Sequence, residues 1–160
     1  MGEWSNFFIG TAGAAATLTG LIFVGVSINL AKILSIPKLP DRALISLILL
    51  LQILILSLLF LVPGQSLTIL GIEVLCLGVI VYATIFKIDI SVFLKTEKKF
   101  RPHYSFNMLL SQIALLPYLI AGFEILLQGE NGFYWLIPAI LFSFLKAVLD
   151  AWVLLVEINR

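Results

Sequence analysis

A pair of charged residues inside an apolar run is the feature of the sequence with the clearest chemical potential. Lys146 and Asp150 stand near the middle of the run 133–158. If this run crosses a bilayer, each unpaired charge costs about 2.5 to 3.5 kcal/mol on insertion scales. The four-residue spacing puts both side chains on one helix face, where they can pair. We expect the pair to face a bundle interior or a hydrated crevice, either as a structural ion pair or as a site for transport, proton relay or partner docking.

Enzyme chemistry has little support in the sequence. Ser143, one turn before Lys146, forms the only candidate pair of nucleophile and general base, and Asp150 would hold the amine protonated. The sequence has no His-Glu-x-x-His, Gly-x-Ser-x-Gly or phosphate-binding glycine loop. Its single cysteine and single histidine exclude an internal disulfide and a Cys/His metal cluster. We expect no enzyme, no cofactor and no metal site.

A polar stripe follows the run 104–127. Asn107, Ser111 and Tyr118 share one face of the predicted helix. Pro117 leaves the carbonyl about four residues earlier without its donor, so we expect a kink that faces protein or water. A kinked helix with a polar stripe fits a gate or a binding cavity, and it also occurs in bundles that have no cavity.

Two further acidic residues, Glu73 and Glu124, lie inside apolar runs near connections that contain no basic residue. Together they predict an acidic mouth that would concentrate cations. The competing interpretation is that these carboxyls are partly neutral, or that they pair with Lys146 across the bundle. A central ammonium also opposes simple cation flow unless a carboxylate neutralises it.

The composition indicates that membrane helices position these residues. Of the 160 residues, 61% are hydrophobic and 12% charged, and the mean hydropathy is +1.14, whereas a soluble domain is about one quarter charged. A helix needs about 20 apolar residues to cross the hydrocarbon core. The sequence therefore predicts an all-α, polytopic bundle in one membrane domain, 1–160. Five runs qualify, with the third possibly extended to Leu94: 7–34, 43–62, 67–88, 104–127 and 133–158.

The distribution of Lys and Arg predicts the orientation. Apart from Lys146, the basic residues flank the first and third connections or end the chain. By the positive-inside rule, these regions face the cytoplasm, the N-terminus lies outside and the C-terminus is cytoplasmic. The residues concerned are Lys32, Lys38, Arg42, Lys87, Lys95, Lys98, Lys99, Arg101 and Arg160.

The first run is unusually rich in small residues. In lipid, helices associate through close packing and hydrogen bonds, so small residues mark contact faces. We expect this helix to be either the centre of the bundle or the seam of a homo-oligomer, with a pore lining as the sharper alternative. The candidate packing residues are Gly13, Ala16, Thr17, Gly20 and Ser27.

The second run, 43–62, is nearly all Leu and Ile. This composition predicts a lipid-facing position. Gln52 is the strongly polar side chain near its middle, and we expect it to hydrogen-bond to a neighbouring helix.

The segment 12–30 (AGAAATLTGLIFVGVSINL) resembles the opening helix of small, uncharacterised bacterial multi-pass membrane proteins. The resemblance implies a bacterial inner-membrane setting and carries no activity. The residues themselves predict an oligomeric channel or small transporter for an ion or solute. The alternative is a non-catalytic accessory subunit of a larger membrane complex or membrane protease. We expect the lipid bilayer, further copies of the chain or a partner membrane protein as partners, and no nucleic acid, because the net charge is only +1.

Overall fold

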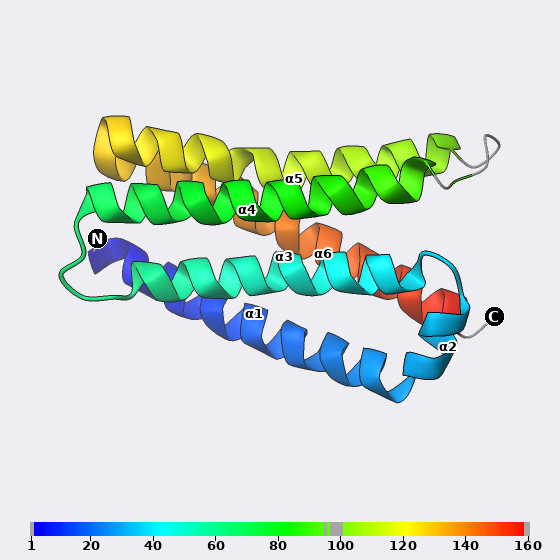
Figure 1. The fold of residues 1–160 in the computed structure, drawn as a ribbon. Helices are drawn as coiled ribbons and strands as arrows, with labels where there is room; N and C mark the ends of the chain where they lie inside the picture. The colour runs from blue at the N-terminus through cyan, green and yellow to red at the C-terminus, as the bar shows by residue number, and fades with distance from the viewer. Residues whose placement is uncertain (1, 95, 97–100, 159–160) are drawn as a thin grey trace.

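The structure is a computed structural model that describes residues 2–94, 96 and 101–158. Its described part is helical almost throughout and contains no strand, which confirms the all-helical prediction. The long helices α1, α3, α4, α5 and α6 lie side by side, and the start of α1 and the end of α6 are at opposite ends of the bundle (Figure 1). The elements are α1 (Gly2–Ile28), α2 (Leu30–Ser35), α3 (Leu39–Phe60), α4 (Leu67–Leu94), α5 (Arg101–Gln128), the 3-10 helix η2 (Gly129–Trp135) and α6 (Leu136–Ile158).

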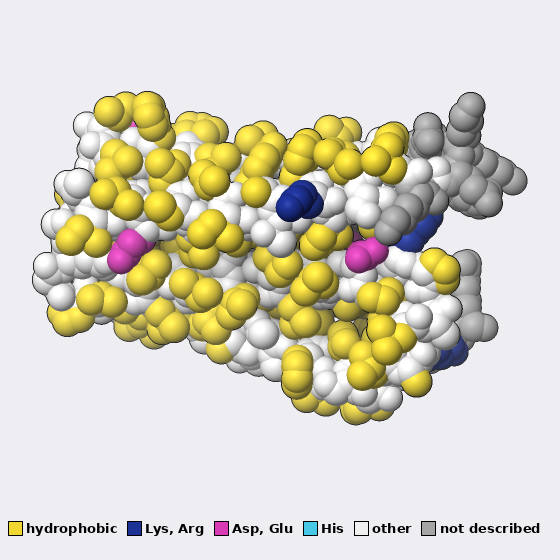
Figure 2. Space-filling view, viewed as in Figure 1, with side chains coloured by type: hydrophobic (Ala, Val, Ile, Leu, Met, Phe, Trp, Pro, Cys, Tyr) yellow, Lys and Arg dark blue, Asp and Glu magenta, His cyan; other side chains and the backbone are white. Residues whose placement is uncertain are grey.

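Four helical segments are long and apolar enough to cross a membrane. They are Trp4–Ile28, Leu39–Phe60, Leu67–Leu94 and Tyr104–Ile158. The last segment contains both α5 and α6, which pack against each other because the chain turns back at η2. Figure 2 shows hydrophobic side chains along the whole length of the visible face, with few charged ones among them. These are the features of a membrane protein.

Several helix boundaries differ from the predicted runs, and three of these differences have a local cause. The first run is interrupted at Asn29, whose side-chain amide donates to the Gly25 carbonyl at 3.0 Å and competes with the regular helix. The second helix begins at Leu39 because Pro40 fits the first turn of a helix. The last helix begins only at Leu136, since 133–135 belong to η2. The extension of the third run to Leu94 is confirmed.

The central helix is α3. It packs against α1, α4 and α6. In the 18-residue apolar stretch of each helix that could span a membrane, 50% of the residues are buried in α3, compared with 17% in α1. Two predictions therefore need correction for the single chain. α3 keeps an exposed apolar face, at Leu44, Leu51 and Leu58, but is more buried than α1, and α1 is not the centre of the bundle. The physical reason is that lipid and a helix core are equally apolar, so a Leu/Ile-rich helix fits either environment.

The two ends of the bundle differ in chemistry. At the η2 end, which also carries the N-terminus, Phe60 stacks on Phe8 at 4.3 Å between ring centroids and meets Phe133 edge-on at 5.0 Å. Both Phe8 and Phe133 are buried, so aromatic rings close this end. The opposite end, called here the α2 end, carries the basic side chains of Lys38 and Arg42.

Replacing Gly122 by alanine is expected to lower the free energy of unfolding by about 1 to 3 kcal/mol, the usual effect of overpacking. A Cβ at Gly122 would lie 2.8 Å from the Leu75 nitrogen and 2.9 Å from its Cα, so α4 and α5 would have to separate. Gly10→Ala is the matched control because a Cβ there meets nothing within 4 Å, and helix propensity predicts a neutral to slightly stabilising effect. Thermal unfolding in detergent, followed by circular dichroism, distinguishes the two. Equal effects would contradict the close α4–α5 contact.

Candidate functional site

The buried face of α6 carries the predicted charged pair. Lys146 and Asp150 are each 2% exposed, and the Lys146 ammonium donates to the Asp150 carboxylate one turn later. Ser143 lies one turn before Lys146 on the same buried face. The pair thus sits inside the bundle, where the surrounding helices shield it from lipid.

A second carboxyl joins this pair from another helix. Asp89 of α4 is 6% exposed, and Lys146 and Asp150 lie close enough to act on its charge. The Ser111 hydroxyl of α5 faces the same carboxyl. Among the described residues, however, the Asp89 Oδ2 atom has no hydrogen-bond partner. We call Asp89, Lys146 and Asp150 the charged cluster.

The charged cluster contains more acidic than basic groups. One ammonium faces two carboxyls, so the fully ionised cluster carries a net charge of −1 in a nearly water-free environment. Buried charges persist in a membrane only when they are paired and hydrogen-bonded. The cluster therefore has the charge balance of a site that takes up one more positive charge, as a proton or a small cation.

Hydroxyl groups continue from the charged cluster toward the η2 end. Tyr118 of α5 and Ser143 of α6 are fully buried and face each other, yet neither hydroxyl makes a hydrogen bond within the described part of the chain. A pocket of about 20 Å³ lies beside Lys146, lined by apolar side chains of α5 and α6. Its volume suffices for about one water molecule, and it excludes an organic solute.

The charged cluster is approached from the α2 end. A pocket of about 350 Å³ opens there, lined among others by Lys38, Arg42, Tyr104 and Glu157. Val153 and Glu157 of α6 also line it, about one and two helical turns beyond Asp150. This polar pocket thus lies on the α2 side of the charged cluster along α6.

The other predicted transport residues lie elsewhere. Asn107 is half-buried on α5, and its backbone carbonyl accepts a hydrogen bond from Ser111 at 3.4 Å. Glu73 accepts a hydrogen bond from Gln65 near the η2 end, and Glu124 is half-buried in the same layer of α5. Lys146 pairs with Asp150, so the structure brings neither glutamate into the charged cluster.

The predicted packing residues of α1 contact little within the chain. All five are exposed: Gly13, Ala16, Thr17, Gly20 and Ser27. A Cβ at either glycine would meet nothing within 4 Å. The Thr17 and Ser27 hydroxyls bond carbonyls of their own helix at 2.8 and 2.7 Å. In the single chain, this face of α1 is open to lipid or to another helix.

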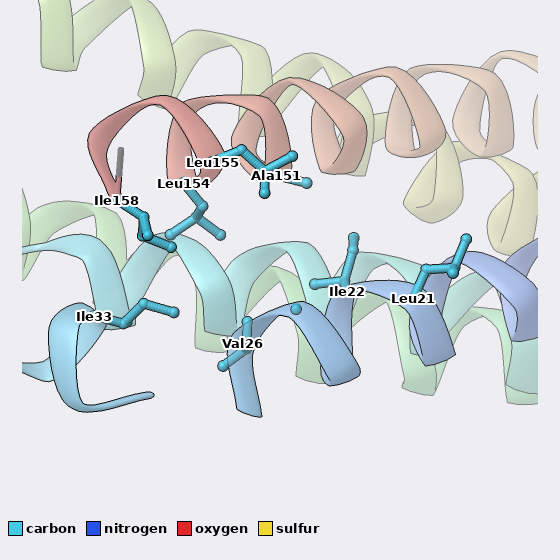
Figure 3. A pocket seen from close by; sticks show the side chains of 9 residues that line it. Leu21, Ile22, Val26, Ile33, Ala151, Leu154, Leu155 and Ile158 are labelled. Atoms are coloured by element: carbon cyan, nitrogen blue, oxygen red, sulfur yellow. The ribbon is translucent and has the colours of Figure 1, made fainter. Parts of the chain in front are cut away.

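Beside this face, an apolar pocket of about 170 Å³ separates the second half of α1 from the end of α6. Figure 3 shows Ile22 and Val26 of α1 and Ile33 of α2 facing Ala151, Leu154 and Ile158 of α6 across it. The lining has no charged side chain, so the pocket suits a hydrocarbon surface.

The prediction that Gln52 bonds to a neighbouring helix is wrong. Its side chain is 1% exposed, and neither amide atom has a hydrogen-bond partner within the described residues. Gln52→Leu is therefore expected to raise the free energy of unfolding by about 1 kcal/mol, because it removes an unsatisfied buried amide of similar size. Denaturant unfolding in detergent checks this. A loss of stability would mean that the amide has a partner in the membrane.

Two residues of the site were missed from the sequence, Asp89 and Arg42. Asp89 follows the apolar run 67–88 and falls in its possible extension to Leu94, next to the charged residues of the connection. A signal was nevertheless present, because Gly78, Ile85 and Asp89 lie on one face of a helix, and the structure buries that face. Arg42 was counted only toward the orientation of the chain.

The chemistry available to the charged cluster is the binding and release of a positively charged ion. Among the described residues, no group of three or more His, Cys, Asp or Glu side chains is placed to hold a metal ion. With two carboxyls and one ammonium, the charged cluster has the charge balance to take up one proton or monovalent cation. Comparisons of the chain with protein-family models, curated proteins and solved structures find no match.

Proposed function

We propose that this chain is a small multi-pass membrane transporter that binds and moves a proton or another small monovalent cation at the charged cluster. One observation carries the proposal: the buried Lys146–Asp150 pair has a second carboxyl, Asp89, with an unpartnered oxygen beside it. A bound cation would bring the cluster to zero net charge, which lowers the energy of holding it inside a membrane.

Transport by binding and release is favoured over an open channel. The Lys146 ammonium lies at the site and repels free cations, so passage needs the neighbouring carboxylates. The space of about 20 Å³ beside Lys146 is too small for an organic substrate. The closely packed rings of Phe8, Phe60 and Phe133 close the η2 end. These features support a carrier that opens toward the α2 end.

The proposed topology has five crossings, with the N-terminus outside and the C-terminus in the cytoplasm. It is supported by the opposite positions of the two termini in Figure 1 and by Lys38 and Arg42 at the α2 end. The pocket at that end would then open to the cytoplasm. Several basic residues used in this prediction lie outside the described residues, namely Lys95, Lys98, Lys99 and Arg160. The membrane proposed is a bacterial inner membrane.

The exposed small-residue face of α1 is the proposed seam of a homo-oligomer. Its glycines accept a close neighbour without a steric clash, and small residues are the usual contact points between membrane helices. The seam lies on α1, whereas the residues of the charged cluster lie on α4 and α6. Each subunit would therefore carry its own ion site.

Reconstitution of the purified chain into liposomes tests the proposal. With a proton, Na⁺ or K⁺ gradient across the membrane, we expect flux of one of these ions above that of empty liposomes, recorded with an internal pH-sensitive or ion-sensitive dye. Folded protein, verified by circular dichroism, that carries none of the three ions would contradict the proposal.

The second candidate function is that of a non-catalytic accessory subunit. The observation in its favour is the exposed α1 face together with the apolar pocket between α1 and α6, a surface on which a partner helix fits. Gly20→Cys, made in a Cys76→Ser background, places a crosslinkable thiol on this face. A crosslink to a different membrane protein with no flux from the isolated chain favours the accessory function. A crosslink between copies of the chain favours the homo-oligomer.

A further inference from the structure

Arg42, in the first turns of α3, is buried, and no acidic side chain among the described residues pairs with it. The residue is 8% exposed, and its guanidinium makes no hydrogen bond or ion pair with the residues that the structure describes. The guanidinium carbon of Arg42 lies over the Tyr104 ring, 5.8 Å from the ring centroid, within the range of a cation–π interaction. A guanidinium has five donors, and arginine is almost never buried without a group that accepts them. The side chain lines the pocket at the α2 end.

A second cation is held against the same ring. The Lys38 ammonium lies 4.4 Å from the Tyr104 centroid and donates to the Thr96 hydroxyl at 2.9 Å. Lys38 also adopts a left-handed backbone conformation, with φ of 73°, which is unfavourable for a residue that has a Cβ. A strained backbone thus holds a second positive charge beside the first, although like charges repel each other.

The pocket formed around these cations carries excess positive charge. Among its described lining residues, Glu157 is the one acidic side chain, against the two cations Lys38 and Arg42. The pocket also lies at the N-terminus of α3, where the helix dipole favours an anion. Its volume of about 350 Å³ is that of a small ligand site.

We propose that Arg42 and Lys38 bind a phosphate oxyanion in this pocket, with the Tyr104 ring holding both cations in place. A guanidinium matches two phosphate oxygens with a pair of parallel hydrogen bonds, and an ammonium supplies a point charge beside them. The phosphate belongs either to the headgroup of an anionic phospholipid or to a soluble phosphate. Because the site requires no ion transport, this inference stands apart from the proposed function.

Anion titration of the full-length, delipidated protein in a neutral detergent tests the site. Phosphatidylglycerol, phosphatidylcholine and inorganic phosphate are added separately, and binding is measured by native mass spectrometry and by the shift in melting temperature. We expect phosphatidylglycerol or inorganic phosphate to bind the wild type, and Arg42→Gln to weaken this binding about 10- to 100-fold, as expected for lost charge-assisted hydrogen bonds. Arg42→Lys should restore part of the affinity.

Lys32→Gln is the matched control, because Lys32 is exposed on α2 at the same end of the bundle. It removes one positive charge and leaves the pocket intact, so binding should stay within about two-fold of the wild type, as for an exposed, screened charge. Binding of phosphatidylglycerol but not of phosphate identifies a lipid headgroup, and binding of phosphate alone identifies a soluble anion.

The proposal is overturned if no anion binds, if phosphatidylcholine binds as well as phosphatidylglycerol, or if Arg42→Gln and Lys32→Gln weaken binding equally. If circular dichroism shows that Arg42→Gln does not fold, Lys38→Gln decides instead. That variant keeps Arg42 and must still weaken anion binding by at least about five-fold, the loss of one charged hydrogen bond. Unchanged binding in Lys38→Gln also overturns the proposal.

Discussion

Replacing Lys146 by methionine is expected to lower the free energy of unfolding by about 3 to 5 kcal/mol, the usual effect of removing one partner from a buried ion pair. Methionine fills nearly the same space as the lysine side chain but leaves Asp89 and Asp150 next to each other without the ammonium that stabilises them. Two carboxylates in a poorly hydrated environment repel each other. Denaturant unfolding in detergent, followed by tryptophan fluorescence, measures the loss.

A second substitution should reverse most of this loss. Asp150→Asn in the Lys146→Met background removes one of the two uncompensated charges and leaves a neutral amide of similar shape. A thermodynamic cycle of the two single variants and the double variant then gives the coupling energy of the pair, which should exceed about 1 kcal/mol for residues in direct contact. A loss of stability that simply adds across the two substitutions would contradict the pairing.

Lys87→Met is the control for this experiment. Lys87 is exposed on α4, in the same helix as Asp89 and one residue before the end of the predicted run 67–88. Removing an exposed charge changes stability by no more than about 0.5 kcal/mol. If Lys146→Met were as mild as Lys87→Met, the charged cluster would not be a stabilised unit of the bundle, and the site assigned to it would lose its basis.

The spacing of Lys146 and Asp150 was sufficient to predict a buried pair on one face of α6. Residues four positions apart share a helix face whatever the rest of the chain does. Asp89 was beyond such reasoning. Its place beside the pair depends on how α4 packs against α5 and α6, and no local pattern encodes which helix lies next to which. Its position on the Gly78–Ile85 stripe marks a contact face but does not identify the partner helix.

The position of each helix in the bundle was also beyond the sequence, and the reason is the solvent. In water, the apolar face of a helix points to the core, so composition and burial agree. In lipid, the Leu- and Ile-rich α3 is central and the glycine-rich α1 is peripheral, the reverse of what was expected. Gly122 and Gly13 make the point for single residues, since one sits against the Leu75 backbone and the other in open space.

Replacing Asp89 by asparagine is expected to reduce ion flux in liposomes to the level of protein-free liposomes while leaving the protein folded. The amide has nearly the same shape as the carboxyl, so the packing of α4 against α5 should be preserved. It cannot take up a proton, and it leaves Lys146 and Asp150 as a neutral pair with no surplus negative charge to attract a cation. The free energy of unfolding should therefore stay the same or rise.

Asp41→Asn is the matched control, because Asp41 is a half-buried carboxyl in the first turn of α3, outside the charged cluster. The ion flux through the Asp41→Asn variant should equal that of the wild type. Asp89→Glu, which keeps the carboxyl, should retain part of the flux. A purely structural role for Asp89 predicts the opposite pattern: lower stability and normal flux per folded molecule. The two measurements on one variant therefore separate an ion site from an ion pair that serves only to hold α4, α5 and α6 together.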